Sequence, residues 1–230
     1  MTPDRKQQTM TTDDKPKGAG AWKSPAWYGA GMPMPADAAG RKRARLAMTG
    51  IQRVLIDQGH LARPLRPLDG GAGDQTTAAI KKLQRQWGLA QTGKVKRPEA
   101  FCLWFPIILW WQVTLEIPDN LLCGMIALES GYDPGAEGVV DLRDRGVGQF
   151  SSRWWPNVSD EMAFGDPAAC IALTAHNLQA AYQRLGAWEL AVAAHNNPAK
   201  AQAWKDAGEA PDEQIARYVR LVQAAAGRPL

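Results

Sequence analysis

The chain of 230 residues is long enough for one or two domains, and its 45% hydrophobic composition is ordinary for a globular protein. Lys and Arg outnumber Asp and Glu by 27 to 23, but unevenly: residues 1–105 are basic, whereas residues 106–230 are acidic. A basic amino-terminal half suits an anionic polymer. We expect no nucleic-acid partner, because no nucleic-acid recognition motif accompanies the basic residues.

Residues 1–45 combine Pro, Gly, Thr, Lys and Asp with little periodicity, which predicts a flexible or docking arm. Within it, the basic run 41–45 is interpreted as a solvated tether. Aromatic residues in such an arm favour attachment to a larger assembly: Trp22, Trp27 and Tyr28. No secretory signal is expected, since residues 1–17 are polar and lack an apolar core.

Residues 46–105 predict a small three-helix domain. A glycine-rich turn over residues 68–76 precedes a predicted helix over residues 77–89 that ends at glycine. One face of that helix is apolar at helical spacing and should be buried: Ile80, Leu83 and Trp87. We interpret Asp69 and Asp74 as turn and cap residues, not as ligand contacts.

These residues resemble the peptidoglycan-binding domain common at the ends of wall hydrolases. The hallmark of that family reads Asp-Gly-x-x-Gly-x-x-Thr, then Ala-Ile-x-x-Phe-Gln, Gly-Leu and Thr-Gly. It is nearly complete between Asp69 and Gly93, with Leu83 in place of the phenylalanine. The resemblance implies that residues 46–105 bind bacterial peptidoglycan.

The most apolar run, residues 100–115, is interrupted by Pro106 and Gln112. It is too short to span a bilayer comfortably, so we expect no stable membrane insertion. We interpret it as the join between two domains and the first helix of the second domain, residues 106–230.

Helix signals continue through that second part, so the whole chain is predicted to be mainly α. Asp166 and Pro167 are a cap and first-turn proline, and Gly186 ends the helix they begin. Residues 188–195 predict the next helix. A last helix opens at Pro211 and Asp212, with an inward face: Ile215, Tyr218, Val219 and Val222.

Glu129 is the residue that most strongly indicates chemistry. Leu121, Met125 and Glu129 are spaced by four, which places the carboxyl on the buried face of a short helix that Gly131 can end. Burial resists ionisation, so a raised pKa is expected for this carboxyl. A protonated carboxyl at a helix end beside a loop is suited to act as a general acid.

Three short motifs follow in order. They are Glu129-Ser130, then Asp144-Arg145-Gly146-Val147-Gly148-Gln149, then Ala193-Ala194-His195-Asn196-Asn197-Pro198. They resemble the "Glu-Ser", "Gly-Leu-Met-Gln" and "Ala-Tyr-Asn-Ala-Gly" motifs of the lytic transglycosylase and goose-type lysozyme superfamily. Asp144 to Gly146 is also similar to the Asp-Arg-Gly of goose-type lysozymes. His195 stands where that superfamily usually has tyrosine.

The resemblance implies an α-helical lysozyme-like domain that cleaves the β-1,4 bond between N-acetylmuramic acid and N-acetylglucosamine, with Glu129 as general acid. Asp144 or Asp141 is available as the second carboxylate of a hydrolase, although a surface ion pair explains either equally well. A transglycosylase manages with one glutamate. The expected substrate contacts are Ser130, Gly146, Gln149, His195 and Asn196. The Trp154-Trp155 pair either stacks on sugar rings or has one buried member and one partly exposed member.

Neither a metal nor a cofactor is expected, because the three cysteines and three histidines show no metal-ligand spacing. A wall-binding module joined to a muramidase-like domain without a signal peptide resembles a bacteriophage lysin. This implies a place in the virion tail or, before release, in the host cytoplasm, with action at the bacterial wall. Phage tail or virion proteins are the expected partners of the amino-terminal arm. The competing class is a virion structural or wall-binding protein that lost efficient catalysis.

Overall fold

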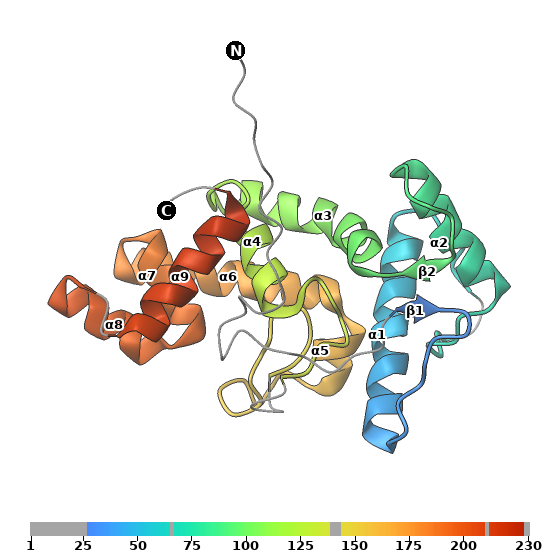
Figure 1. Ribbon diagram of the computed structural model, residues 1–230, viewed down its shortest axis with the longest axis horizontal. Helices are drawn as coiled ribbons and strands as arrows, with labels where there is room; N and C mark the ends of the chain where they lie inside the picture. The colour runs from blue at the N-terminus through green and yellow to red at the C-terminus, as the bar shows by residue number, and fades with distance from the viewer. Residues whose placement is uncertain (1–26, 65–66, 139–143, 210–211, 228–230) are drawn as a thin grey trace, which may run out of the picture.

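The computed structural model describes residues 27–64, 67–138, 144–209 and 212–227, and it is mainly helical, as predicted (Figure 1). The elements in chain order are β1 (Tyr28–Gly29), α1 (Ala38–Asp57), α2 (Asp74–Gln86), β2 (Lys94–Val95), α3 (Arg97–Thr114), α4 (Leu121–Ser130), α5 (Asp160–Gly165), α6 (Pro167–Leu185), α7 (Trp188–Asn196), α8 (Pro198–Ala207) and α9 (Glu213–Ala226).

Helices α1 and α2 and the first turns of α3 form one end of the molecule, together with the antiparallel pair β1–β2 (Figure 1, right). Their apolar side chains interlock in a common core: Ile51, Leu55, Ile80, Leu83 and Leu103. Burial of Ile80 and Leu83 confirms the predicted apolar face of α2. The prediction is wrong for Trp87, which is the C-cap residue and keeps 38% of its surface exposed.

Gln84 is the polar centre of this end of the molecule. Its contacts explain why the sequence pattern described above contains both a glutamine and a Thr-Gly pair. Its Oε1 accepts a hydrogen bond from the Gly93 amide at 2.9 Å. Its Nε2 lies 2.9 Å from both Thr92 Oγ1 and Glu99 Oε1. Because a buried amide left without partners is costly, the glutamine and the Thr-Gly pair require each other. Asp69 is a turn residue, as predicted, and accepts from Gly71 N at 2.7 Å.

Helix α1 begins well before residue 46, which corrects the predicted extent of the arm. Asp37 caps it by accepting a hydrogen bond from Gly40 N, and the basic run 41–45 forms its first turns. The interpretation of this run as a solvated tether is wrong. Lys42 pairs with Glu161 at 2.9 Å, and Arg43 pairs with Glu137 at 2.6 Å, so both contact the carboxy-terminal half.

The aromatic pair at the end of the predicted arm is also part of the fold. Tyr28 lies opposite Val95 in the β1–β2 pair and is 3% exposed. The Trp27 ring lies 4.0 Å from Lys94 Nζ, within the range of a cation–π contact. Trp22 and the rest of residues 1–26 lie outside the described residues.

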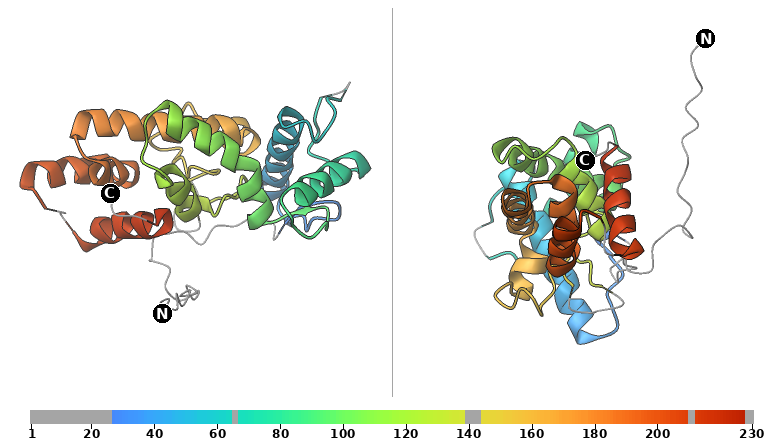
Figure 2. Two further views of the ribbon diagram at one scale, coloured as in Figure 1. Left: turned by 90° about the horizontal axis from the view of Figure 1, so that it is seen from above. Right: turned by 90° about the vertical axis from the view of Figure 1, so that its left-hand side faces the viewer.

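Helix α3 joins the two halves. It runs without a break through positions 105 and 106, where the sequence placed the domain boundary, and Pro106 lies inside it. Among the described residues, no helix is long and apolar enough to cross a membrane. Seen from above, α3 leads from the α1–α2 end toward the helices of the other half (Figure 2, left).

In the carboxy-terminal half, α4 packs against α9, while α7 packs against α6, α8 and α9. The predicted helix limits are confirmed here. Asp166 caps α6 through Ala169 N, and Gly186 ends α6 in the left-handed conformation. Asp212 caps α9 through Ile215 N, and the predicted inward face of α9 is buried.

Candidate active site

Glu129 lies in the last turn of α4. This helix follows Asn120 and ends at Gly131, whose φ of 62° is the left-handed cap predicted from the sequence. Leu121 and Met125, on the same face as Glu129, are fully buried. The Glu129 side chain itself is 17% exposed. The helix therefore holds the carboxyl at the margin of the core, where solvent reaches part of it.

Two side chains from distant helices meet this carboxyl. The hydroxyl of Tyr218, on α9, donates a hydrogen bond to Glu129 Oε1. The Nε2 atom of His195, at the end of α7, lies 3.7 Å from the same oxygen. Burial, and then the negative charge of Glu129, hold the pKa of Tyr218 well above its usual value. The phenol is therefore a permanent donor near neutral pH.

His195 was predicted as a substrate contact from its motif, and the structure places it next to Glu129. Its side chain is 12% exposed. Asn196 is exposed, and together with His195 it lines a pocket of about 360 Å³ between α6, α7 and the segment containing Trp154 and Trp155. The structure thus brings Glu129, His195 and Tyr218 together, and it places Asn196 in the adjoining pocket.

The tryptophan pair lies on the other wall of this pocket. Trp154 is 71% exposed and Trp155 is 38% exposed, so the alternative of one buried member is wrong. The Arg153 guanidinium covers the Trp154 ring at 4.8 Å, and Phe150 meets Trp155 edge-on. Exposed indole faces beside an open pocket are suited to stacking against a sugar ring.

The glycine motif, Gly146-Val147-Gly148-Gln149, has a glycine at position 146 because of how the loop packs. Gly146 has φ of 72°, and a Cβ there would lie 1.9 Å from the carbonyl oxygen of Ala163 in α5. Gly146 was predicted as a substrate contact, but the position of a side chain at Gly146 is occupied by the protein's own backbone. Gln149 directs its amide nitrogen inward, to the carbonyl oxygens of Gly146 at 2.8 Å and Ala136 at 3.3 Å. Gln149 Nε2 therefore organises this turn.

The described contacts of Ser130 and Asp144 are with nearby backbone groups. Ser130 is fully buried, and its hydroxyl donates back to the Ile126 carbonyl at 3.2 Å, so it does not face a substrate. Asp144 lies where Glu137 and Arg145 form a bridge, and its carbonyl accepts from Gly138 N. The described contacts of the Glu129 side chain are with Tyr218 and His195. Asp141 lies outside the described residues.

Tyr218 is the site residue that the sequence reasoning missed. Its position on the inward face of α9 was predicted, but its partner was not. A tyrosine on an otherwise apolar face is itself a signal, because a buried hydroxyl must find an acceptor. Within the described residues, no group of three or more His, Cys, Asp or Glu side chains is placed to hold a metal ion.

Comparison with known proteins adds one finding. Residues 46–97 match the family model described as a putative peptidoglycan binding domain. The matched segment covers most of α1, all of α2, the strand β2 and the first residue of α3. No curated protein and no solved structure matches the chain. The match supports a peptidoglycan-binding domain at residues 46–97 and, with it, a function associated with the bacterial cell wall.

Proposed function

We propose that this protein is a peptidoglycan glycosidase, which cleaves the β-1,4 bond between N-acetylmuramic acid and N-acetylglucosamine with Glu129 as general acid. The observation that carries the proposal is the position of the Glu129 carboxyl. It is largely withdrawn from solvent, accepts a hydrogen bond from Tyr218 and lies beside His195. The peptidoglycan-binding match over residues 46–97 supplies the substrate class.

We assign the two carboxyl oxygens of Glu129 to two different tasks. Tyr218 donates to Oε1, and His195 is next to the same atom. Oε2 is thereby left to carry the acidic proton to the glycosidic oxygen as an oxocarbenium-like state develops on the sugar. Either water or the C6 hydroxyl of the muramic acid then completes the reaction. Water gives a reducing end, and the hydroxyl gives a 1,6-anhydro product.

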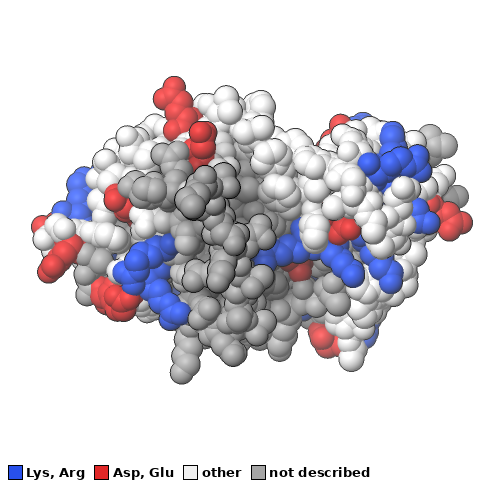
Figure 3. Space-filling view, turned by 45° about the horizontal axis from the view of Figure 1, so that its top comes forward, with Lys and Arg blue, Asp and Glu red and all other residues white. Residues whose placement is uncertain are grey.

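The adjoining pocket is suited to the glycan strand. Trp154 and Trp155 offer apolar faces for sugar rings, and Asn196 offers an amide for hydroxyl or acetamido groups. Arg184 also lines this pocket and provides positive charge for a carboxylate of the stem peptide. Lys and Arg side chains are exposed at the α1–α2 end (Figure 3, right), which favours retention on an anionic wall.

Mass spectrometry of the fragments released from purified peptidoglycan tests this proposal. We expect muropeptides cut at the muramic acid, ending either in a reducing sugar or in a 1,6-anhydro sugar that is one water lighter. Reducing ends would assign Asp144 or Asp141 as the catalytic partner, whereas anhydro ends would leave both with structural roles. Fragments cut at an amide bond, or at glucosamine instead of muramic acid, would contradict the assignment.

The biological setting we propose is that of a bacteriophage lysin, carried in the virion tail or made in the host before release. The second candidate is a virion wall-binding protein without efficient catalysis. His195, in place of the family tyrosine, favours that candidate, because an imidazole is a different partner for the acid. Sedimentation of the protein with purified wall, without any release of fragments, is the outcome expected for the second candidate.

A further inference from the structure

The loop of residues 132–137, which directly follows the Glu129 helix, is fastened by side chains from the amino-terminal half. Three contacts occur in sequence along the loop. Trp104 Nε1 donates to the carbonyl oxygen of Tyr132 at 2.8 Å. Tyr28 donates its hydroxyl hydrogen to Asp133 Oδ1 at 2.7 Å. Arg43 pairs with Glu137 at 2.6 Å.

The Tyr28 contact is closely fitted. Asp133 Oδ1 accepts hydrogen bonds from both the Tyr28 hydroxyl and the Gly135 amide, the latter at 2.8 Å, so one carboxyl oxygen joins strand β1 to the loop of residues 132–137. A Cβ on Gly135 would lie 2.1 Å from the Tyr28 hydroxyl, which means that this glycine leaves space for the phenol. Burial, and then the charge of Asp133, hold the pKa of Tyr28 well above its usual value, so it remains a donor near neutral pH.

The Arg43 contact is equally enclosed. The Arg43 side chain is 11% exposed and that of Glu137 is 19% exposed, and the guanidinium also lies 5.9 Å from the Phe164 ring centre. Removing one partner of an ion pair that has little solvent contact is strongly destabilising, because the other charge is left buried without a partner, whereas an exposed pair contributes little. This contact therefore constrains the loop strongly.

The loop in turn supports the glycine motif. The Ala136 carbonyl accepts from Gly146 N at 2.8 Å and from Gln149 Nε2 at 3.3 Å. Glu137 and Arg145 form an antiparallel bridge beside these bonds. A displacement of residues 132–137 would thus move the turn of residues 146–149, as well as the segment that leads away from Glu129.

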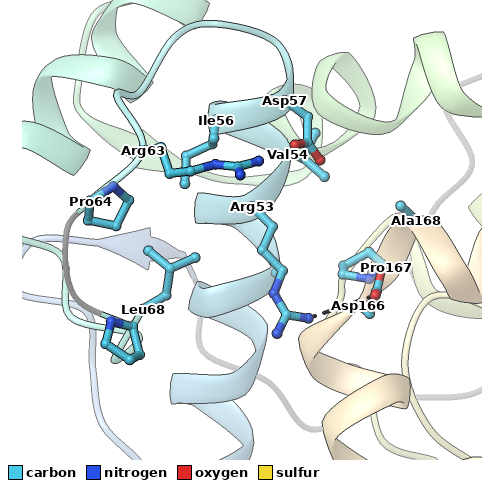
Figure 4. Close-up of a pocket in the computed structure, with 12 residues that line it drawn as sticks. Arg53, Val54, Ile56, Asp57, Arg63, Pro64, Leu68, Asp166, Pro167 and Ala168 are labelled. Carbon is cyan, nitrogen blue, oxygen red and sulfur yellow. Dashed lines mark ion pairs between the residues drawn. The ribbon is translucent and has the colours of Figure 1, made fainter.

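A further contact holds the same two halves together. Arg53, on α1, donates to the Gly165 carbonyl at 2.8 Å and lies 3.8 Å from the Asp166 carboxylate. Figure 4 shows Arg53 pointing from α1 toward Asp166 at the start of α6, across a pocket lined by both halves. The peptidoglycan-binding segment is therefore packed directly on the half that contains Glu129.

We infer that the amino-terminal half positions the candidate active site, with Tyr28, Arg43 and Trp104 as positioning residues that fix the loop of residues 132–137. This inference rests on the proposed function. Its consequence is that wall binding and glycan cleavage belong to one mechanical unit. The amino-terminal half is then needed to hold Glu129 in position. A wall-binding module joined only by a flexible tether could, in contrast, be removed without loss of turnover.

The test compares Tyr28→Phe with the matched control Tyr182→Phe in the full chain. Tyr182 stacks on Trp188 at 4.1 Å, between α6 and α7, and makes none of the loop contacts. Amide hydrogen exchange of the loop peptide and steady-state cleavage of a soluble muroglycan oligosaccharide are both measured. We expect Tyr28→Phe to speed exchange in residues 132–137 and to lower kcat roughly tenfold with KM little changed. Retention on purified wall should be unaffected.

Two outcomes would overturn the inference. One is loop exchange in Tyr28→Phe equal to that of the wild type, and the other is an unchanged kcat at a temperature where both proteins are folded. Arg43 gives a second series: Arg43→Met should impair kcat, and Arg43→Lys, which keeps the charge, should restore part of it. If the wild type cleaves no glycan, the proposed function is contradicted. The positioning role is still tested separately, by the hydrogen-exchange rate of residues 132–137 in Tyr28→Phe.

Discussion

The Tyr218 hydroxyl donates a hydrogen bond to the Glu129 carboxylate, joining two residues that are 89 positions apart in the chain. The contact is possible because α4 and α9 pack against each other, with Val219 and Met125 in the buried core around them. The last helix of the described chain is therefore part of the candidate active site. In the proposed mechanism, Tyr218 on this helix holds one carboxyl oxygen of Glu129 while the other donates the proton.

Removal of this hydroxyl should impair chemistry more than binding. In Tyr218→Phe, the Glu129 carboxyl loses a buried donor worth about 1.5–3 kcal/mol, the range for hydrogen bonds to charged groups. We expect kcat to fall roughly tenfold or more, with KM nearly unchanged. Initial rates on a soluble muroglycan substrate measure this, with Tyr182→Phe as the matched control. Wild-type kcat in Tyr218→Phe would show that the contact is dispensable.

Local signals predicted much of the fold. Gly131, Gly186, Asp166 and Asp212 mark helix ends correctly, because a cap acts within one turn of the chain. His195, in contrast, was connected with Glu129 only through a family motif. The contact between His195 and Glu129 joins separate helices, and no local pattern encodes it.

The errors have a common physical origin. The basic run 41–45 resembles a solvated tether until Glu137 and Glu161, far along the chain, are brought to Arg43 and Lys42. From the sequence, Tyr28 was interpreted as a residue of a free arm. The acceptor of its hydroxyl, Asp133, lies far along the chain and is brought to it only by folding. In each case the partner is supplied by tertiary packing, which neither composition nor periodicity reports.

Gly146 should be among the least replaceable residues of the domain. Gly146→Ala combines a strained left-handed backbone with a Cβ placed 1.9 Å from the Ala163 carbonyl oxygen. We expect a loss of stability of about 3 kcal/mol or more, because the strain contributes about 1–2 kcal/mol and the overpacking about 1–3 kcal/mol. Gly208→Ala is the control, because Gly208 also has positive φ but has open space around its Cβ position.

Denaturant unfolding of both variants checks this prediction. Gly208→Ala should lose only about 1–2 kcal/mol, the cost of the backbone conformation alone. Equal losses in the two variants would show that the contact with α5 is not a constraint.

The cap of α9 should make stability depend on acid pH. The hydrogen bond from Lys200, and then that from the Ile215 amide, lower the pKa of Asp212 from 3.8. Because the folded state favours the ionised form, Asp212 stabilises the fold fully above the unfolded pKa, and this contribution is lost as pH falls through the lower folded pKa. Asp212→Asn keeps a cap acceptor but removes the charge.

Thermal unfolding across pH tests this cap. The difference in Tm between wild type and Asp212→Asn should be constant near neutral pH and should shrink below about pH 4, where Asp212 becomes protonated. A difference that grows as the solution becomes more acidic would contradict the assigned sign.

The pocket beside His195 should contribute to substrate binding. Trp154→Ala removes an exposed indole face, so we expect KM to rise about threefold to tenfold, matching an aromatic contact of about 0.5–1.5 kcal/mol. Stability should change little because Trp154 is 71% exposed. Trp110→Ala, at an exposed tryptophan on α3, is the control for loss of an exposed indole. Equal KM values for the two variants would exclude Trp154 from the binding surface.

The most direct test of the account is the rate at which muropeptides are released from purified peptidoglycan by the wild type, by Glu129→Gln and by Glu209→Gln. Glutamine keeps the shape of the side chain but cannot donate an acidic proton to the glycosidic oxygen. Glu209 is exposed at the end of α8 and serves as the matched carboxyl control. We predict that release falls at least about a hundredfold in Glu129→Gln, within the range of a general acid's contribution, and is unchanged in Glu209→Gln. Release of muropeptides by Glu129→Gln at the wild-type rate would contradict the central claim that Glu129 is the catalytic acid.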